Sequence, residues 1–366
     1  MGFESGAVSF RVYHLPRRLP KDFVERFAEH AAPPLDTVGP APIYGWVSGR
    51  HLLERSLDDL NIVTAGFLHL HLLMVERKIP RSLLVAECRM EELAHMAGQG
   101  SDGVSRKTRM EIRRRVEERL LPKMPPQLTG IPVLHDPSEN RLFAGALSAT
   151  QVDLFTAQFH MTQGIMPIAM DASQAAFVRA QIETRQMQPT SFVPDVDIEQ
   201  VSDHPGHDFL TWLWFAAETR SGVVEVPEQG RFAYLLEGPL TFVMEGDGAH
   251  EIVLRKGQPL ISAEAKTALL SGKKLKSARL TIAQDDRQWQ ATVDGGEFTF
   301  RSVKLPESHA LDTAGRFEDR VRGMQIFTDA FFALYDLFLA ERRDASKWRS
   351  TLTEIGGWIK KRQARK

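Results

Sequence analysis

Two Asp-Gly turns in the second half of the chain constrain its fold more than any other feature of the sequence. "LTFVMEGDGAHEIVLR" and "RQWQATVDGGEFTFRSVK" each place Asp-Gly between two runs of alternating apolar and polar residues. This combination is the strongest short-range signal for a β-hairpin, because the turn needs residues that tolerate a positive φ. "ARLTIAQ" precedes the second pair, so residues 278–304 are predicted to form a three-stranded antiparallel meander.

Helical patterns surround these strands. Apolar residues recur at helical spacing in residues 21–31, 81–98, 150–163 and 207–219. Near the end, Phe327, Phe331, Leu334 and Phe338 form one apolar stripe. Further strands are predicted at 8–15, within 61–80 and at 140–148.

The predicted fold class is α+β, with mainly antiparallel sheets, flanking helices and several lobes. The proline-bearing, polar stretch 185–206 is interpreted as a connection between lobes. We therefore expect an N-terminal α+β lobe over residues 1–190, a C-terminal α+β lobe with the meander over 191–310, and a closing helix with a basic tail over 311–366.

Composition narrows the class of protein. Of 366 residues, 43% are hydrophobic and 25% are charged, which is typical of a globular chain. Cys88 is the only cysteine, which excludes an intrachain disulfide and a cysteine-rich zinc site. No apolar run approaches the roughly 20 residues that span a bilayer, and the first residues lack the pattern of a secretory signal. We expect a cytoplasmic protein without membrane contact.

Common enzymatic motifs are missing from the sequence. It contains no GxxxxGK[ST] phosphate loop, no GxGxxG after a strand and no GxSxG nucleophile elbow. ATP hydrolysis, dinucleotide binding and α/β-hydrolase chemistry therefore lack their signatures. We expect no catalytic residues and no cofactor.

Two groups of histidines have spacings that could supply metal ligands. "HLHLLM" places His69 and His71 on one side of a predicted strand, and "SDHPGHD" holds His204 and His207. Neither group matches a named motif, so both are interpreted as packed or surface histidines and no metal is expected.

One enzymatic alternative remains open. Asp247 is followed by Glu264-x-Lys266, which is similar to the Asp and Glu-x-Lys arrangement of metal-dependent nucleases. Such nucleases need the Glu-x-Lys on a central strand. "ISAEAKTALLSG" instead predicts a short helix with Ser262 as its N-cap, so a solvated helical face is the preferred interpretation.

The most basic segment is "SRKTRMEIRRRVEERLLPK", residues 105–123, with eight Lys or Arg side chains. On a helix, Ile112, Val116 and Leu120 would form a stripe that docks on a core. Glu111 with Arg115, Arg113 with Glu117, and Arg114 with Glu118 are spaced to form ion pairs, each contributing about 0.2–0.5 kcal/mol. The cations expected to stay unpaired are Arg106, Lys107, Arg109, Arg119 and Lys123.

This segment supports two interpretations: an exposed helix stabilised by its own ion pairs, or a contact with the phosphates of DNA. The chain carries 46 basic and 47 acidic side chains, for a net charge of -1, so any surface for a polyanion must be local. The eight basic side chains of the segment exceed its three acidic ones by five. About five phosphate contacts would give a slope of log affinity against log salt concentration near -4.5.

Two further basic patches are present. "SGKKLKSAR" holds Lys273, Lys274, Lys276 and Arg279 at the entrance to the meander. Residues 342–366 hold nine Lys or Arg against two acids, together with two tryptophans that could stack on bases or anchor to the protein. The alternative without a binding role is that this tail is a basic terminus that increases solubility.

The order of segments resembles the recombination-associated protein RdgC family over residues 8–341. The resemblance is carried by "FRVYHL", "GWV", "ERKIP", the basic "RRRVEERLLPKM", "QGIMPIAM", the turn and meander "SGKKLKSARLTIAQDDRQWQATVDGGEFTFRSVKL", and "FTDAFFALYDLFLAE". The chain departs from the family pattern in its basic tail after Glu341 and in the tryptophan-rich "HDFLTWLWFAAETRSG".

The resemblance implies a non-catalytic protein that binds double-stranded DNA without sequence preference. It also implies a ring-shaped homodimer with a basic inner surface, a nucleoid-associated location and restraint of the RecA recombinase. By position, the residues expected to face DNA are Arg106, Lys107, Arg109, Arg113, Arg114, Arg115, Arg119, Lys123, Lys273, Lys274, Lys276 and Arg279. Besides the nuclease, the other alternative is a scaffold whose basic tail meets an acidic partner protein.

Overall fold

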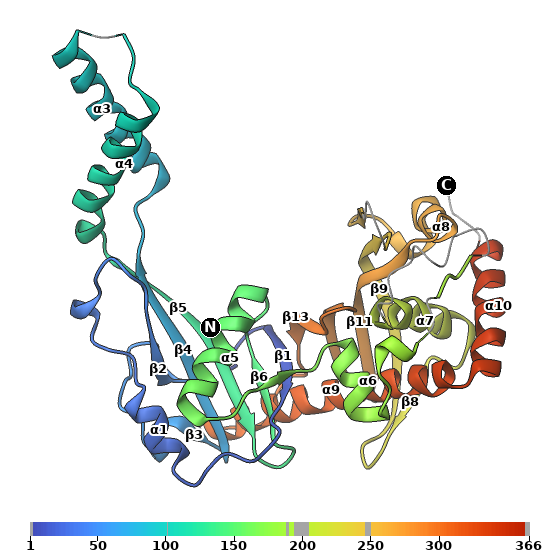
Figure 1. The fold of residues 1–366 in the computed structure, drawn as a ribbon. Coiled ribbons are helices and arrows are strands. Elements are labelled where there is room, and N and C mark those ends of the chain that lie inside the picture. The colour runs from blue at the N-terminus through green and yellow to red at the C-terminus, as the bar shows by residue number, and fades with distance from the viewer. Residues whose placement is uncertain (1–2, 101, 188–189, 194–204, 246–249, 363–366) are drawn as a thin grey trace.

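The structure is a computed structural model that describes residues 3–100, 102–187, 190–193, 205–245 and 250–362. It confirms the α+β class: a large antiparallel sheet is flanked by helices (Figure 1). None of the helices within these residues is long and apolar enough to cross a membrane.

The strands are β1 (Val8–His14), β2 (Ile43–Ser48), β3 (Val63–Thr64), β4 (Phe67–Arg77), β5 (Pro126–Asp136), β6 (Arg141–Ala144), β7 (Ile168–Ala169), β8 (Val223–Val226), β9 (Gly230–Val243), β10 (Glu251–Leu254), β11 (Lys274–Gln284), β12 (Arg287–Asp294) and β13 (Thr299–Lys304). The α-helices are α1 (Phe23–Glu29), α2 (Asp59–Ile62), α3 (Arg81–Gln99), α4 (Arg106–Leu120), α5 (Ala149–Gln163), α6 (Ala172–Ala180), α7 (Pro205–Thr219), α8 (Ala263–Leu270), α9 (Thr313–Arg343) and α10 (Ala345–Lys361).

The predicted hairpins are present as strand pairs. β11, β12 and β13 form the antiparallel meander, and Val293 of β12 lies opposite Phe300 of β13. β9 pairs with β10, with Val243 opposite Glu251, although the Asp-Gly of that hairpin lies outside the described residues. The alternation of apolar and polar residues in the sequence therefore predicted both strand pairs.

One strand joins the two halves of the sheet. The order is β10-β9-β11-β12-β13-β1-β6-β5-β4-β2, so the first strand of the chain lies beside the last. β1 pairs with β13 through Val8 and Phe10, and with β6 from Arg11 to His14. Because β1 changes partner along its length, it forms a seam between the two lobes, and residues close to the N-terminus are part of the larger core.

The longest helix lies beneath this seam. α9 contacts β3 in the N-terminal lobe and β8 in the C-terminal lobe (Figure 1). Phe327, Phe331, Leu334 and Phe338 are all buried, as the stripe predicted. They belong to the same hydrophobic cluster as the meander strands and α7, so α9 shares the core of the C-terminal lobe.

A two-helix arm projects away from the sheet. β4 and β5 pair along their whole length, from Leu68 opposite His135 to Arg77 opposite Pro126, and α3 and α4 continue from that end (Figure 1). We call residues 81–123 the arm. The arm and the C-terminal lobe rise on the same side of the sheet, which makes the outline of the molecule a crescent (Figure 1).

Candidate nucleic-acid interface

The arm has a small hydrophobic core of its own. Ile112, Val116 and Leu120 are buried, as predicted, and pack against apolar side chains that include Leu84 and Cys88. Ser105 caps α4, because its hydroxyl accepts a hydrogen bond from the Thr108 amide at 3.1 Å. The arm is therefore a helical hairpin that displays one side of α4 to solvent.

Two of the three ion pairs predicted along α4 are present. The guanidinium of Arg113 lies 2.8 Å from Glu117, and that of Arg114 lies 2.8 Å from Glu118. The pair expected between Glu111 and Arg115 is not among the ion pairs of the described residues. Arg115 is therefore an exposed cation without a carboxylate partner among them.

Two arginines that the sequence left unpaired are neutralised across the hairpin. Arg109 lies 3.3 Å from Glu92 of α3, and Arg119 lies 2.9 Å from both Glu87 and Glu91. The expectation that both would be unpaired is wrong, because spacing within one helix says nothing about carboxylates on its neighbour. Both guanidiniums retain exposed surface, but their charge is largely offset.

Five exposed cations of the arm remain without an ion pair among the described residues: Arg81, Arg106, Lys107, Arg115 and Lys123. Residues 81–123 hold ten basic and seven acidic side chains, a net charge of +3. The arm is thus modestly positive and its unpaired cations are exposed to solvent, which suits contact with a phosphate backbone rather than readout of bases.

The lysine-rich turn does not form a basic surface. Lys273 is 7% exposed and Lys274 is 2% exposed. The prediction that these two lysines face DNA is therefore wrong. Lys276 is paired with Glu251 on β10. Arg279 is half-buried on β11. The apolar neighbours of this turn pull it into the core, where its charges need buried partners.

Lys274 finds these partners in a buried cluster. Its ammonium lies 2.6 Å from Asp208 at the start of α7 and 2.8 Å from Glu245, whose other oxygen lies 2.7 Å from His207. Burial alone would lower the pKa of Lys274, but the two carboxylates outweigh it and the pKa is raised. The lysine therefore stays charged inside the protein.

This cluster was not predicted from the sequence. Its only signal was a carboxylate directly before the apolar run "FLTWLWF" and a lysine directly before the apolar residues of β11.

The paired histidines of β4 are buried. His69 and His71 lie on the same side of the strand, with ring centroids 5.9 Å apart. Burial lowers the pKa of His69 to about 3 and that of His71 to about 4, so both are neutral near pH 7. No group of three or more histidine, cysteine or acidic side chains suited to a metal occurs among the described residues. His204 and Asp203 lie outside them.

The Glu-x-Lys of the nuclease alternative lies on a helix. Glu264 is in the first turn of α8, where the Ser262 hydroxyl accepts from the Ala265 amide as predicted. Lys266 donates to the carbonyl of Arg362 at 2.7 Å. Asp247 lies outside the described residues. The described part of this motif therefore lies on a helix rather than on a central strand, and Glu264 is exposed to solvent.

The tail is anchored to the C-terminal lobe. α10 buries Trp348, which lies edge-on to Phe338 at 5.7 Å between ring centroids. The indole of Trp358 donates to Glu218 at 2.9 Å and lies edge-on to Trp214 at 5.3 Å. Of the two roles that the sequence left open for these tryptophans, the structure shows anchoring to the protein.

Searches of the sequence against protein-family models and against curated proteins gave no match.

Proposed function

We propose that the protein binds double-stranded DNA through its phosphate backbone, with the arm as the principal contact and without catalysis. The observation that carries this proposal is the set of five exposed cations without ion pairs among the described residues of the arm, Arg81, Arg106, Lys107, Arg115 and Lys123. When cationic side chains contact the phosphates of DNA, the counterions bound to the DNA are released. This release favours binding that does not depend on the base sequence.

The remaining parts of the proposal rest on the resemblance to the RdgC family. It implies a homodimer that encircles the duplex, restrains RecA and is associated with the nucleoid. The crescent outline supports a two-fold dimer, because a pair of crescents can meet at both ends and close a ring (Figure 1).

The salt dependence of DNA binding tests the role of the arm. A chain in which Arg106, Lys107 and Arg115 are replaced by Gln is expected to lower the slope of log affinity against log salt by about 2.7 per chain, because each phosphate contact contributes about 0.9. The matched control replaces the exposed Lys347, Arg349 and Lys360 of α10 by Gln, with the same loss of charge.

Gel shifts with unrelated duplexes at several salt concentrations measure both slopes. Equal loss in the two variants would show that net charge, rather than the arm, determines binding. Cleavage of DNA with Mg²⁺ that is abolished by Glu264→Ala would replace the proposal with the nuclease alternative. If deletion of residues 342–366 abolished binding of a partner protein but left DNA binding intact, the result would favour the alternative of a scaffold whose basic tail contacts an acidic partner.

A further inference from the structure

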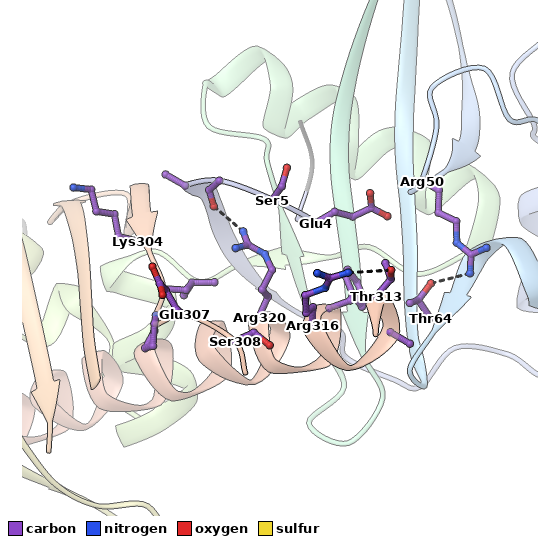
Figure 2. Close-up of a pocket in the computed structure, with 16 residues that line it drawn as sticks. Glu4, Ser5, Arg50, Thr64, Lys304, Glu307, Ser308, Thr313, Arg316 and Arg320 are labelled. Atoms are coloured by element: carbon purple, nitrogen blue, oxygen red, sulfur yellow. Dashed lines mark hydrogen bonds between the residues drawn. The ribbon is translucent and has the colours of Figure 1, made fainter. Parts of the chain in front are cut away.

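A pocket of about 1290 Å³ lies between the two lobes, far from the arm. Figure 2 shows its walls: the N-terminal segment before β1, Thr64 of β3, the end of β13 and the first turns of α9. It lies at the opposite end of β4 from the arm, roughly 30 Å away along a strand that rises about 3.3 Å per residue. The pocket is therefore separate from the proposed DNA contact.

Four cationic side chains line this pocket: Arg50, Lys304, Arg316 and Arg320. They come from three segments that are distant in sequence: the loop after β2, the end of β13 and two successive turns of α9. Figure 2 shows Arg320 rising from α9 toward the N-terminal segment, and Arg50 approaching Thr64 beside the start of the helix. The fold thus gathers a row of cations along one hollow.

Three of these cations have side-chain hydrogen bonds among the described residues, and all of the acceptors are neutral. Arg320 donates to the carbonyls of Phe3 and Gly6 at 2.9 and 2.7 Å. Arg316 reaches Thr313, and Arg50 reaches Thr64, each at 3.5 Å. None of the four lining cations is in an ion pair with a carboxylate of the described residues. Elsewhere in the molecule, by contrast, arginines such as Arg119 are neutralised by carboxylates.

The carboxylates of the pocket do not balance this charge. Glu4 and Glu307 are the acidic residues that line it, so four cations face two carboxylates. The N-terminal end of α9 also borders the pocket at Thr313 and Ala314, but its dipole is already met by the carboxylate of Asp312, which accepts from the Gly315 amide at 2.6 Å. Behind Glu4 lies His69, which is 1% exposed and has neither ring nitrogen hydrogen-bonded. Its Nδ1 is 4.0 Å from the Glu4 carboxylate.

We propose that this pocket binds a small ligand with two or more phosphate groups, of the nucleoside polyphosphate class. Arginine guanidiniums present paired donors that match phosphate oxygens, and several of them together recognise a chain of phosphates. Leu305, Pro306 and Phe317 supply apolar wall for the rest of the ligand. At about 1290 Å³ the pocket is somewhat larger than a typical small-molecule site of about 300–1,000 Å³, so it has room for a polyphosphate together with its organic part.

Calorimetric titration of the full chain with pyrophosphate, and with ATP in the absence of divalent metal, tests this proposal. Arg316→Gln and Arg50→Gln are each expected to weaken binding about tenfold, the loss typical of one charged hydrogen bond. Glu4→Gln is expected to strengthen it, because a repelling carboxylate is removed. The matched control is Arg322→Gln on the same helix, whose guanidinium faces Glu318 at 3.5 Å and does not line the pocket.

Absence of binding by millimolar pyrophosphate and ATP would overturn the proposal, as would equal losses in Arg322→Gln and Arg316→Gln. A single-stranded oligonucleotide that binds in place of ATP and is lost in Arg316→Gln would also overturn it, in favour of a polymer site. Gel shifts of the same variants with duplex DNA are expected to be unchanged. The failure of this proposal and that of the DNA proposal are therefore distinguishable.

Discussion

At the scale of single residues, Lys274 and Lys276 show how two lysines of one strand can differ in role. Lys274 is 2% exposed and is enclosed by Asp208 and Glu245, whereas Lys276 pairs with Glu251 at the surface. Removing one partner from a buried ion cluster leaves a charge without compensation, which costs far more than breaking an exposed pair.

We therefore expect Lys274→Gln to lower the free energy of unfolding by about 3–5 kcal/mol. The matched change Lys276→Gln is expected to cost less than about 1 kcal/mol. Urea denaturation followed by circular dichroism measures both. Equal costs would mean that water reaches the carboxylates of Asp208 and Glu245.

The buried histidines of β4 make stability depend on pH. Their pKa values in the folded state, about 3 for His69 and about 4 for His71, lie below the value near 6.5 expected in the unfolded chain. The unfolded chain therefore takes up protons first as the pH falls, and stability is lost below about pH 6.5. Between pH 7 and pH 5 each histidine is expected to remove about 2 kcal/mol from the free energy of unfolding.

Urea denaturation at the two pH values checks this, with His69→Gln as the comparison. The variant is expected to lose about 2 kcal/mol of the pH dependence. A pH dependence identical to that of the natural chain would show that His69 titrates in the folded state.

At the scale of elements, the arm is a separate packing unit. The cluster of Ile112, Val116 and Leu120 contacts neither of the two large hydrophobic clusters. A small core holds a helical hairpin only while its apolar contacts are complete, so local unfolding of the arm should precede global unfolding.

Val116→Asp is expected to unfold the arm and leave both lobes folded, because Val116 is fully buried in that small core. Limited trypsin digestion should then cut within residues 81–123 while the main thermal transition stays in place. Leu93→Asp is the control, since Leu93 is 50% exposed on the same hairpin. Loss of the main transition in Val116→Asp would mean that the arm supports the whole fold.

Elements were also where sequence interpretation succeeded. The meander, the helix of residues 81–98, the N-cap at Ser262 and the apolar stripes of α4 and α9 are confirmed. Each depends on residues within a few positions of one another. The ion pairs of Arg109 and Arg119 with α3 were missed, because each joins two different helices. Arg119 and Glu91 are 28 residues apart in the sequence, and Arg109 and Glu92 lie on opposite sides of the connection between α3 and α4.

At the scale of the whole molecule, the crescent leaves exposed apolar side chains at its projecting end. On the arm, Val85 is 60% exposed and Met110 is 66% exposed, and both line the same hollow between α3 and α4. Apolar surface of this kind on a projecting element is typical of a contact with a second chain.

We expect the chain to sediment with twice the mass of one copy, and the double change of Val85 and Met110 to Lys to shift it toward the monomer. The control changes Met161 and Met166 to Lys, two methionines that are 56% and 49% exposed elsewhere on the surface. A natural chain that sediments as a monomer at micromolar concentration would contradict the homodimer, and equal shifts in both variants would contradict the role of the arm.

The amino-acid sequence by itself determined the class of fold, the hairpin pairs and several of the helices with their buried faces, because turn chemistry and hydrophobic periodicity act over a few residues. It did not predict α6 or the helix α10 within the basic tail. Only the tertiary structure decided which charges are free. It buried Lys273 and Lys274, neutralised Arg109 and Arg119, and gathered Arg50, Lys304, Arg316 and Arg320 around one pocket. The physical reason is that the exposure and the partners of a charged side chain depend on the segments that pack against it, and those segments lie far away along the chain.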